Sequence, residues 1–182
     1  TQWGSRAAVD SLLDILAITM RGDVRSDVLK ELERHVALLG EFQNRPGIDA
    51  TRLASLLANL TRLRSDLAGA GAGWLQPLRD SEFLAAVKHR SAIPGGTCEF
   101  DLPDYYFWLN QPGEARVEAF GRWLALLRPL CDAIAELLWL TRQNGRAREE
   151  IARGGVFNVT FDRDTPYQLL RITLRSDALT GL

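Results

Sequence analysis

Apolar residues in the first third of the chain recur three and four positions apart, which is the period of amphipathic α-helices. A first helix, with Ser5 as its cap, is expected to bury Val9, Leu12, Leu13, Leu16 and Met20. A second helix is expected to begin near Ser26 and to end at the turn 44–47; it would bury Val28 or Leu29, Leu32, Val36 and Leu39. Asp49 is expected to cap a third helix with a stripe of Leu53, Leu56, Leu57, Leu60, Leu63 and Leu67. Short connections predict that the three helices are antiparallel.

The middle of the chain is also predicted to be helical. A short helix over 81–90 leads into the connection 91–103, whose glycines at 95 and 96 can adopt positive φ and whose prolines fix their own φ. We therefore expect this connection to be ordered. A helical turn rich in aromatic residues follows over 104–110, and residues 114–143 form a long helix with a kink at Pro129.

Near the C-terminus the apolar period changes from that of a helix to that of a strand. Phe157, Val159 and Phe161 alternate with polar residues, as do Leu170, Ile172 and Leu174, while residues 162–167 supply turn chemistry. The predicted fold class is α+β, with a mainly α-helical domain at 1–150 and the start of a small antiparallel β-domain at 151–182. Since two strands alone are marginally stable, further strands are expected outside this sequence, which opens at Thr1 without a Met and is expected to be part of a longer protein.

Charge adds only a local feature to this picture. The 22 basic and 23 acidic side chains leave a net charge of -1, so no global basic excess favours nucleic acid or an anionic membrane. Between residues 142 and 175, however, the sequence contains seven arginines and only four acidic residues. On the second predicted strand Arg171 and Arg175 would point the same way, about 13 Å apart, and could meet an extended acidic peptide. The solvated outer face of a sheet has the same pattern.

Candidate chemistry is sparse. Two cysteines and two histidines cannot assemble a zinc-type spacing, so neither metal nor cofactor is expected. The glycines at 69, 71 and 73 follow a helix rather than a strand and lack a helix-opening phosphate cradle. Cys131 and Cys98 are expected to be packing thiols, and Asp101 and Asp104 helix caps. No uncharged apolar stretch is long enough to insert into a membrane. We expect no enzymatic activity.

The segment 91–103, Ser-Ala-Ile-Pro-Gly-Gly-Thr-Cys-Glu-Phe-Asp-Leu-Pro, is followed by an aromatic stretch that ends in Trp108-Leu109. Together they resemble the central signature of the ZapD family of bacterial cell-division proteins. Further matches are 21–25 (Arg-Gly-Asp-Val-Arg), 29–34 (Leu-Lys-Glu-Leu-Glu-Arg) and 169–174 (Leu-Leu-Arg-Ile-Thr-Leu). These segments follow one another in the family's order across most of the chain.

The resemblance implies a non-enzymatic cytoplasmic protein at the mid-cell division site. It implies a homodimer that binds the C-terminal tail of FtsZ, the tubulin-like GTPase, and cross-links FtsZ filaments into bundles; apolar helix surface near Trp123 or Trp139 is expected at the dimer contact. The expected FtsZ-binding residues are Arg21, Arg25, Arg79, Lys88, Arg90, Arg171 and Arg175. The alternative is a helical nucleic-acid-binding module that uses the same arginines, with steep salt dependence as its signature. A small acyl or nucleotide enzyme would need converging titratable groups that the sequence does not offer.

Overall fold

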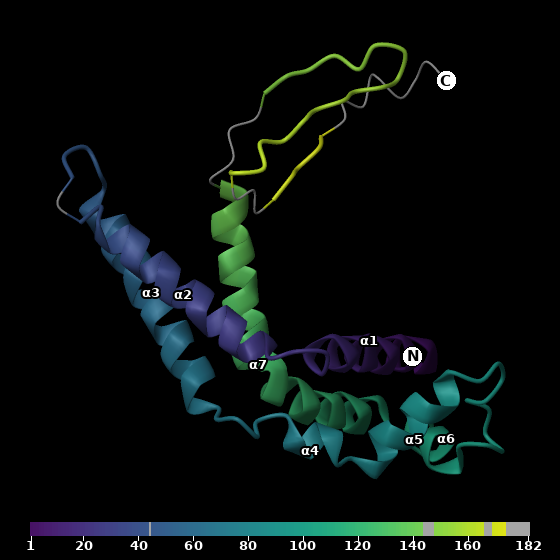
Figure 1. The fold of residues 1–182 in the computed structure, drawn as a ribbon. Coiled ribbons are helices and arrows are strands. Elements are labelled where there is room, and N and C mark those ends of the chain that lie inside the picture. Colours follow the sequence, from purple (N-terminus) through teal and green to yellow (C-terminus); the bar gives the residue numbers. More distant parts are fainter. Residues whose placement is uncertain (44, 144–147, 166–168, 174–182) are drawn as a thin grey trace. The chain divides into compact units, whose positions relative to one another are not determined.

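The computed structural model describes residues 1–43, 45–143, 148–165 and 169–173. Their helices, in chain order, are α1 (Gln2–Thr19), α2 (Val24–Gly40), α3 (Ala50–Gly69), α4 (Gln76–Arg79), α5 (Glu82–Ser91), α6 (Pro103–Leu109) and α7 (Gly113–Gln143) (Figure 1). Contacts divide the chain into two units, Thr1–Ala135 and Glu136–Leu182. Because this boundary falls inside α7, the domain boundary near residue 150 stays a prediction.

The first helix begins earlier than the pattern predicted. Thr1, rather than Ser5, caps α1, and its hydroxyl accepts a hydrogen bond from the Gly4 N–H at 3.1 Å. The predicted leucines and Val9 are buried, but Met20 is 51% exposed. Thr19 is buried in its place, and its hydroxyl donates back to the Leu16 carbonyl at 3.0 Å. Because this hydrogen bond satisfies the hydroxyl group, the polar Thr19 side chain can be buried at the end of the apolar face of α1.

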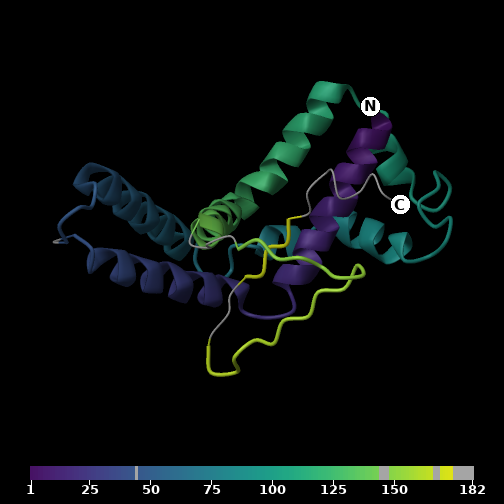
Figure 2. The same cartoon turned by 90° about the horizontal axis from the view of Figure 1, so that it is seen from above.

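Helices α2 and α3 form a hairpin, and Figures 1 and 2 show them side by side. Helix α2 begins at Val24, two residues before the expected Ser26, and Asp23 caps it. Asp49 caps α3 as predicted and accepts from the Arg52 N–H at 3.0 Å. Four of the six predicted leucines of α3 are buried, and Leu56 and Leu57 are half-buried. The prediction of three antiparallel helices therefore holds only for α2 and α3, because the apolar face of α1 packs into a different core.

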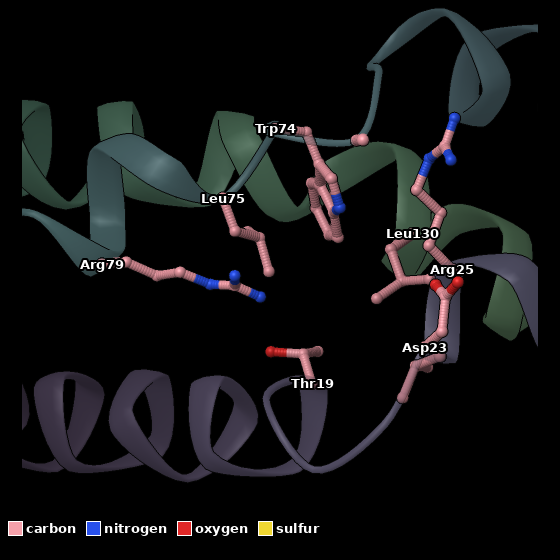
Figure 3. Close-up of a pocket in the computed structure, with 9 residues that line it drawn as sticks. Thr19, Asp23, Arg25, Trp74, Leu75, Arg79 and Leu130 are labelled. Carbon is pink, nitrogen blue, oxygen red and sulfur yellow. The ribbon is translucent and has the colours of Figure 1, made fainter.

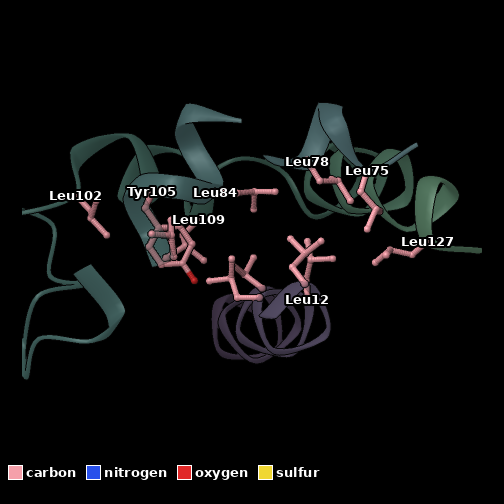
Figure 4. Close-up of a cluster of buried hydrophobic side chains, with 12 residues drawn as sticks. Leu12, Leu75, Leu78, Leu84, Leu102, Tyr105, Leu109 and Leu127 are labelled. Carbon is pink, nitrogen blue, oxygen red and sulfur yellow. The ribbon is translucent and has the colours of Figure 1, made fainter. Parts of the chain in front are cut away.

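That core lies where α1 meets α4, α5, α6 and the first half of α7 (Figure 4). Its buried members are Val9, Leu12, Leu13, Leu16, Leu75, Leu78, Leu84, Val87, Leu102, Tyr105, Leu109 and Leu127. Five aromatic rings extend it: those of Phe83, Tyr105, Trp108, Phe120 and Trp123, in contact at centroid distances of 5.7–6.1 Å. Apolar burial is the main stabilising term in folding, and α1 buries its apolar face in this core rather than against α2 and α3.

The connection between α5 and α6 is ordered by main-chain hydrogen bonds, as predicted. The Gly96 N–H donates to the Ile93 carbonyl at 2.9 Å, and the Leu102 N–H donates to the Cys98 carbonyl at 3.0 Å. Gly95 has φ +76°, which glycine favours, but Gly96 is required for another reason. A Cβ on Gly96 would lie 2.5 Å from the Arg90 carbonyl oxygen, so the close approach of the backbone, not positive φ, demands glycine there.

The predicted antiparallel β-domain is wrong for the residues that the structure describes. Segments 148–165 and 169–173 contain no strand or sheet, only an isolated bridge between Arg153 and Val156. Apolar side chains in the two alternating runs are exposed; Phe157 is 48% and Ile172 75% accessible. Alternating apolar and polar residues give an extended segment one apolar face. A β-strand forms only if the backbone of a neighbouring segment also supplies the inter-strand hydrogen bonds. Residues 174–182, which include Leu174 and Arg175, lie outside the described residues.

The long helix α7 forms as predicted and continues through Pro129. Proline costs a helix one backbone hydrogen bond, so packing must offset that loss. On either side of it, Leu127 and Leu130 are 0% and 2% exposed. Their burial within the first unit stabilises α7 at the position where the proline weakens the helix.

Candidate functional site

A groove of about 250 Å³ lies within the first unit, between the end of α1, the start of α2 and the segment 72–79. Its lining residues are Thr19, Asp23, Val24, Arg25, Ala72, Trp74, Leu75, Arg79 and Leu130 (Figure 3). The lining combines two arginines with an indole and two leucines. The groove therefore brings together two of the seven predicted binding residues, Arg25 and Arg79, from positions 54 apart in the sequence.

The guanidinium of Arg25 is held by the last turn of α3. Nε donates to the Leu67 carbonyl at 3.1 Å, and Nη2 donates to the Ala68 carbonyl at 2.8 Å. Both carbonyls belong to the last turn of α3, where the Ala68 carbonyl also accepts from the Gly71 N–H at 3.2 Å, and the negative end of the helix dipole attracts a cation there. Arg25 thus joins the first turn of α2 to the end of α3, and Figure 3 shows its guanidinium turned away from Arg79.

The carboxylate of Asp23 is bound to the first turn of α2. It accepts from the Ser26 N–H at 3.1 Å and from the Ser26 hydroxyl at 2.5 Å. These hydrogen bonds, with smaller contributions from the charges of Arg25 and Lys30, lower the pKa of Asp23 below its usual value. Asp23 is consequently an anion at neutral pH, and its lone pairs are partly used by the helix it caps.

Arg79 ends α4 and is exposed. Among the described residues its guanidinium makes no hydrogen bond or ion pair, and Figure 3 shows this group projecting into the space between Thr19 and Leu75. Trp74 is half-buried and packs against the core cluster around α1, which fixes its indole at the wall of the groove. A cation next to a fixed aromatic surface can bind a ligand that carries both a carboxylate and an apolar group.

The other predicted binding residues do not line this groove. Arg21 is exposed just after α1, and Lys88 and Arg90 lie in the last turn of α5, where basic side chains complement the helix dipole. Arg90 also lies 3.8 Å from the Asp101 carboxylate. Arg171 is exposed in an irregular segment of the second unit, so the strand that was expected to align it with Arg175 is absent from its described part.

Sequence reasoning missed Trp74, Thr19 and Leu130 as groove residues. One signal was available for Trp74, because a large aromatic residue directly after a glycine- and alanine-rich run has an unusual setting for a linker. Thr19 and Leu130 carried no such signal. They occupy ordinary positions in helical patterns, and only the packing of α1 against α7 brings them to one groove.

Neither cysteine is set up as a nucleophile. Both cysteines are exposed, so the expectation that they are packing thiols is wrong. Partial desolvation and the nearby charge of Asp132 raise the pKa of the Cys131 thiol, which favours its unreactive protonated form. The Cys98 thiol donates to an Asp101 carboxylate oxygen at 3.2 Å. Within the described ranges no three His, Cys, Asp or Glu side chains come close enough to hold a metal ion.

No helix in the part of the chain that the structure describes is both long and apolar enough to cross a lipid bilayer.

Comparison with protein families matches residues 1–180 to the family described as ZapD, cell division protein. Two similar curated proteins are both named cell division protein ZapD. The one from Dechloromonas aromatica (strain RCB) is 37% identical over 171 residues, which are 94% of this chain and 68% of the relative. The one from Janthinobacterium sp. (strain Marseille) is 35% identical over 167 residues, 92% of this chain and 66% of the relative. The chain therefore spans about two thirds of the length of these relatives.

Proposed function

Because this chain belongs to the ZapD family of cell division proteins, we propose that it serves cell division as a non-enzymatic cross-linker of FtsZ filaments. In this proposal the protein acts in the cytoplasm at the mid-cell division site. It binds the short C-terminal tail of FtsZ, and a dimer of the protein joins two filaments. Bundles form because each dimer presents two tail sites.

The groove beside Arg79 and Trp74 is the observation that carries this proposal. By family expectation the FtsZ tail holds both acidic and apolar residues, and peptide capture of that kind needs a cation next to an apolar surface. The groove supplies both, and the Arg79 guanidinium has no hydrogen-bond or ion-pair partner among the described residues. The wider set proposed to attract the tail is Arg21, Arg25, Arg79, Lys88, Arg90, Arg171 and Arg175.

A two-fold dimer is the least demanding way to provide two sites. Exposed apolar side chains on α7 are candidates for the contact, since Val117 is 73% and Leu124 39% accessible. Trp123 is half-buried in the aromatic cluster, and Trp139, in the second unit, is 43% accessible. Light scattering at micromolar concentration should give the mass of a dimer for the intact protein; a monomer alone would contradict cross-linking by this route.

Co-sedimentation with polymerised FtsZ tests the proposal directly. The protein should pellet with intact FtsZ and increase the amount of bundled polymer. With FtsZ that lacks its tail, the protein should stay in the supernatant and the amount of bundled polymer should not increase. Equal pelleting with both forms of FtsZ would reject the tail as the binding partner. Tight, steeply salt-dependent binding to duplex DNA in the same buffer would favour the nucleic-acid alternative instead.

A further inference from the structure

We infer that the groove recognises one carboxylate on Arg79 together with a neighbouring apolar side chain against Trp74, and that Arg25 positions this site without contacting the ligand. The inference rests on the proposed function. It assigns different roles to two arginines that sequence analysis does not distinguish: Arg79 binds the ligand, and Arg25 positions the site. Its occupant is an acidic and apolar stretch of extended peptide.

The charges that line the groove are not equally available to a ligand. The guanidinium of Arg25 already donates to two carbonyls of α3, and the Asp23 carboxylate accepts two hydrogen bonds from Ser26. A ligand carboxylate would have to break an existing hydrogen bond to use Arg25 fully. Arg79 has no such bond within the described residues, so it is the cation that a carboxylate can reach at the lowest cost.

The apolar half of the site is rigid. Trp74 packs on the core cluster, Leu75 is 2% exposed and Leu130 is 2% exposed, so the groove wall is backed by well-packed side chains. A preorganised wall costs little entropy when a ligand side chain settles on it. An indole face also accepts aromatic and aliphatic groups alike, which suits a leucine, isoleucine or phenylalanine beside the acid.

One end of the groove holds the guanidinium of Arg79, and the other holds the carboxylate of Asp23 next to Arg25, whose guanidinium is already bound to α3. Figure 3 shows Arg79 and Asp23 well separated, with Leu75 and Trp74 above the space between them. A second carboxylate near Asp23 would be repelled, and an apolar or basic residue would be accepted there. This charge complementarity favours a peptide with its acid at the Arg79 end and its apolar side chain at the Trp74 wall.

Arg25 acts through the backbone that it holds. The carbonyls of Leu67 and Ala68 stand immediately before the glycine-rich run that leads to Trp74, so Arg25 fixes where that run departs from α3. A change at Arg25 should therefore alter the groove together with the stability of the hairpin. A change at Arg79 should alter binding alone.

The test uses the full chain, labelled with ¹⁵N, and the probe N-acetyl-Asp-Phe-amide at millimolar concentration. The Trp74 indole N–H signal, assigned with Trp74→Phe, and the Arg79 Nε–H signal should shift together and saturate. N-acetyl-Asn-Phe-amide and N-acetyl-Asp-Ala-amide should each bind at least about fivefold more weakly. Arg79→Gln should abolish the preference for Asp over Asn, and Arg52→Gln, the same charge change at the far end of α3, should preserve it.

Three outcomes would overturn the inference: no shift at Trp74 with the probe, equal affinity for the Asp and Asn probes, or an unchanged preference in Arg79→Gln. An Arg25→Lys variant that keeps wild-type hairpin stability but loses the probe would also contradict the positioning role of Arg25. Failure of the proposed function looks different, because the probe would still bind to the groove while FtsZ without its tail pelleted the protein as well as intact FtsZ.

Discussion

The guanidinium of Arg116, near the start of α7, donates from Nε to the hydroxyl of Ser5 on α1 at 3.0 Å. Nη1 of the same side chain donates to the Leu109 carbonyl at 2.7 Å and also contacts the Gln111 carbonyl. One half-buried side chain therefore joins α1 and α7 and caps the end of α6, where helix carbonyls lack partners.

Replacing Arg116 with Met should destabilise the protein without removing much apolar surface. Several carbonyl and hydroxyl groups would lose a charged donor, so we expect the free energy of unfolding to fall by about 2 kcal/mol in urea denaturation. Arg122→Met is the matched control. Its exposed ion pair with Glu118 should contribute less than about 0.5 kcal/mol. Equal losses in both variants would mean that the contacts of Arg116 do not stabilise the fold.

Substitutions at the neighbouring glycines should separate backbone strain from steric clash. Gly96→Ala places a Cβ 2.5 Å from the Arg90 carbonyl oxygen and should cost about 2 kcal/mol of stability, seen as a lower Tm. Gly95→Ala has open space but a φ of +76° and should cost about 1 kcal/mol. Gly22→Ala, which meets neither problem, should leave Tm nearly unchanged. A Gly96→Ala variant as stable as wild type would show that the connection relaxes freely.

Tyr105 should make stability fall at alkaline pH. Burial, with a smaller contribution from the charge of Asp10, raises the pKa of this phenol from its ordinary value of 10.0 to about 12. Above pH 10 the unfolded chain loses the proton more readily than the folded one, so folding stability is lost as the pH rises towards 12. The loss attributable to Tyr105 should approach about 2 kcal/mol. Urea denaturation at pH 9 and pH 11.5 should show this difference in wild type and a smaller one in Tyr105→Phe.

Charge reversal at Arg79 should weaken FtsZ bundling more than charge reversal at Arg171. Arg79 projects into the groove, whereas Arg171 lies in an irregular exposed segment. Light scattering of FtsZ polymers should drop strongly with Arg79→Glu while circular dichroism stays unchanged. Raised salt should weaken wild-type bundling in the same direction. If Arg171→Glu has the larger effect, the tail binds outside the groove.

Arginine and lysine should not be equivalent at position 25. Lysine keeps the charge but cannot donate along two directions to the Leu67 and Ala68 carbonyls. Arg25→Lys should therefore lower the stability by about 1 kcal/mol. Arg79→Lys should leave Tm unchanged, because the described residues offer no partner to lose. Equal thermal stability of the two variants would contradict the capping role of Arg25.

The helical half of the fold was predictable because its information is local. Asp49 caps α3 where a carboxylate precedes a leucine stripe, and the periodic leucines of that stripe are buried or half-buried. Local signals also misplaced details: the second helix was expected to begin near Ser26, but it begins at Val24 with Asp23 as its cap. The period of its apolar residues predicts that a segment is helical, but it does not predict which other helices that apolar face packs against. For this reason the sequence predicts the helix α1 correctly but predicts the wrong neighbours for it.

The β-domain and the groove lay beyond local information for different reasons. The alternation of apolar and polar residues at 157–161 is a property of one segment alone. A β-strand also requires backbone hydrogen bonds to a second segment, which the alternation does not predict. The groove depends on the packing of α1, α2, α4 and α7, which brings Thr19, Trp74 and Leu130 together from distant positions. The seven expected binding residues followed from their basic character and from the family resemblance; the fold brings two of them, Arg25 and Arg79, to one groove, and their role in binding stays a prediction.

The capping of α3 by Arg25 has a consequence for how this groove can change over generations. The residue at position 25 binds the chain's own backbone, so a substitution there is tolerated only if the hairpin of α2 and α3 still folds. The residue at position 79 contacts only the peptide that the groove binds, so it can change when the charge of that peptide changes. Two arginines that line one surface would thus drift under separate constraints, and a new specificity could arise at Arg79 while Arg25 stays fixed.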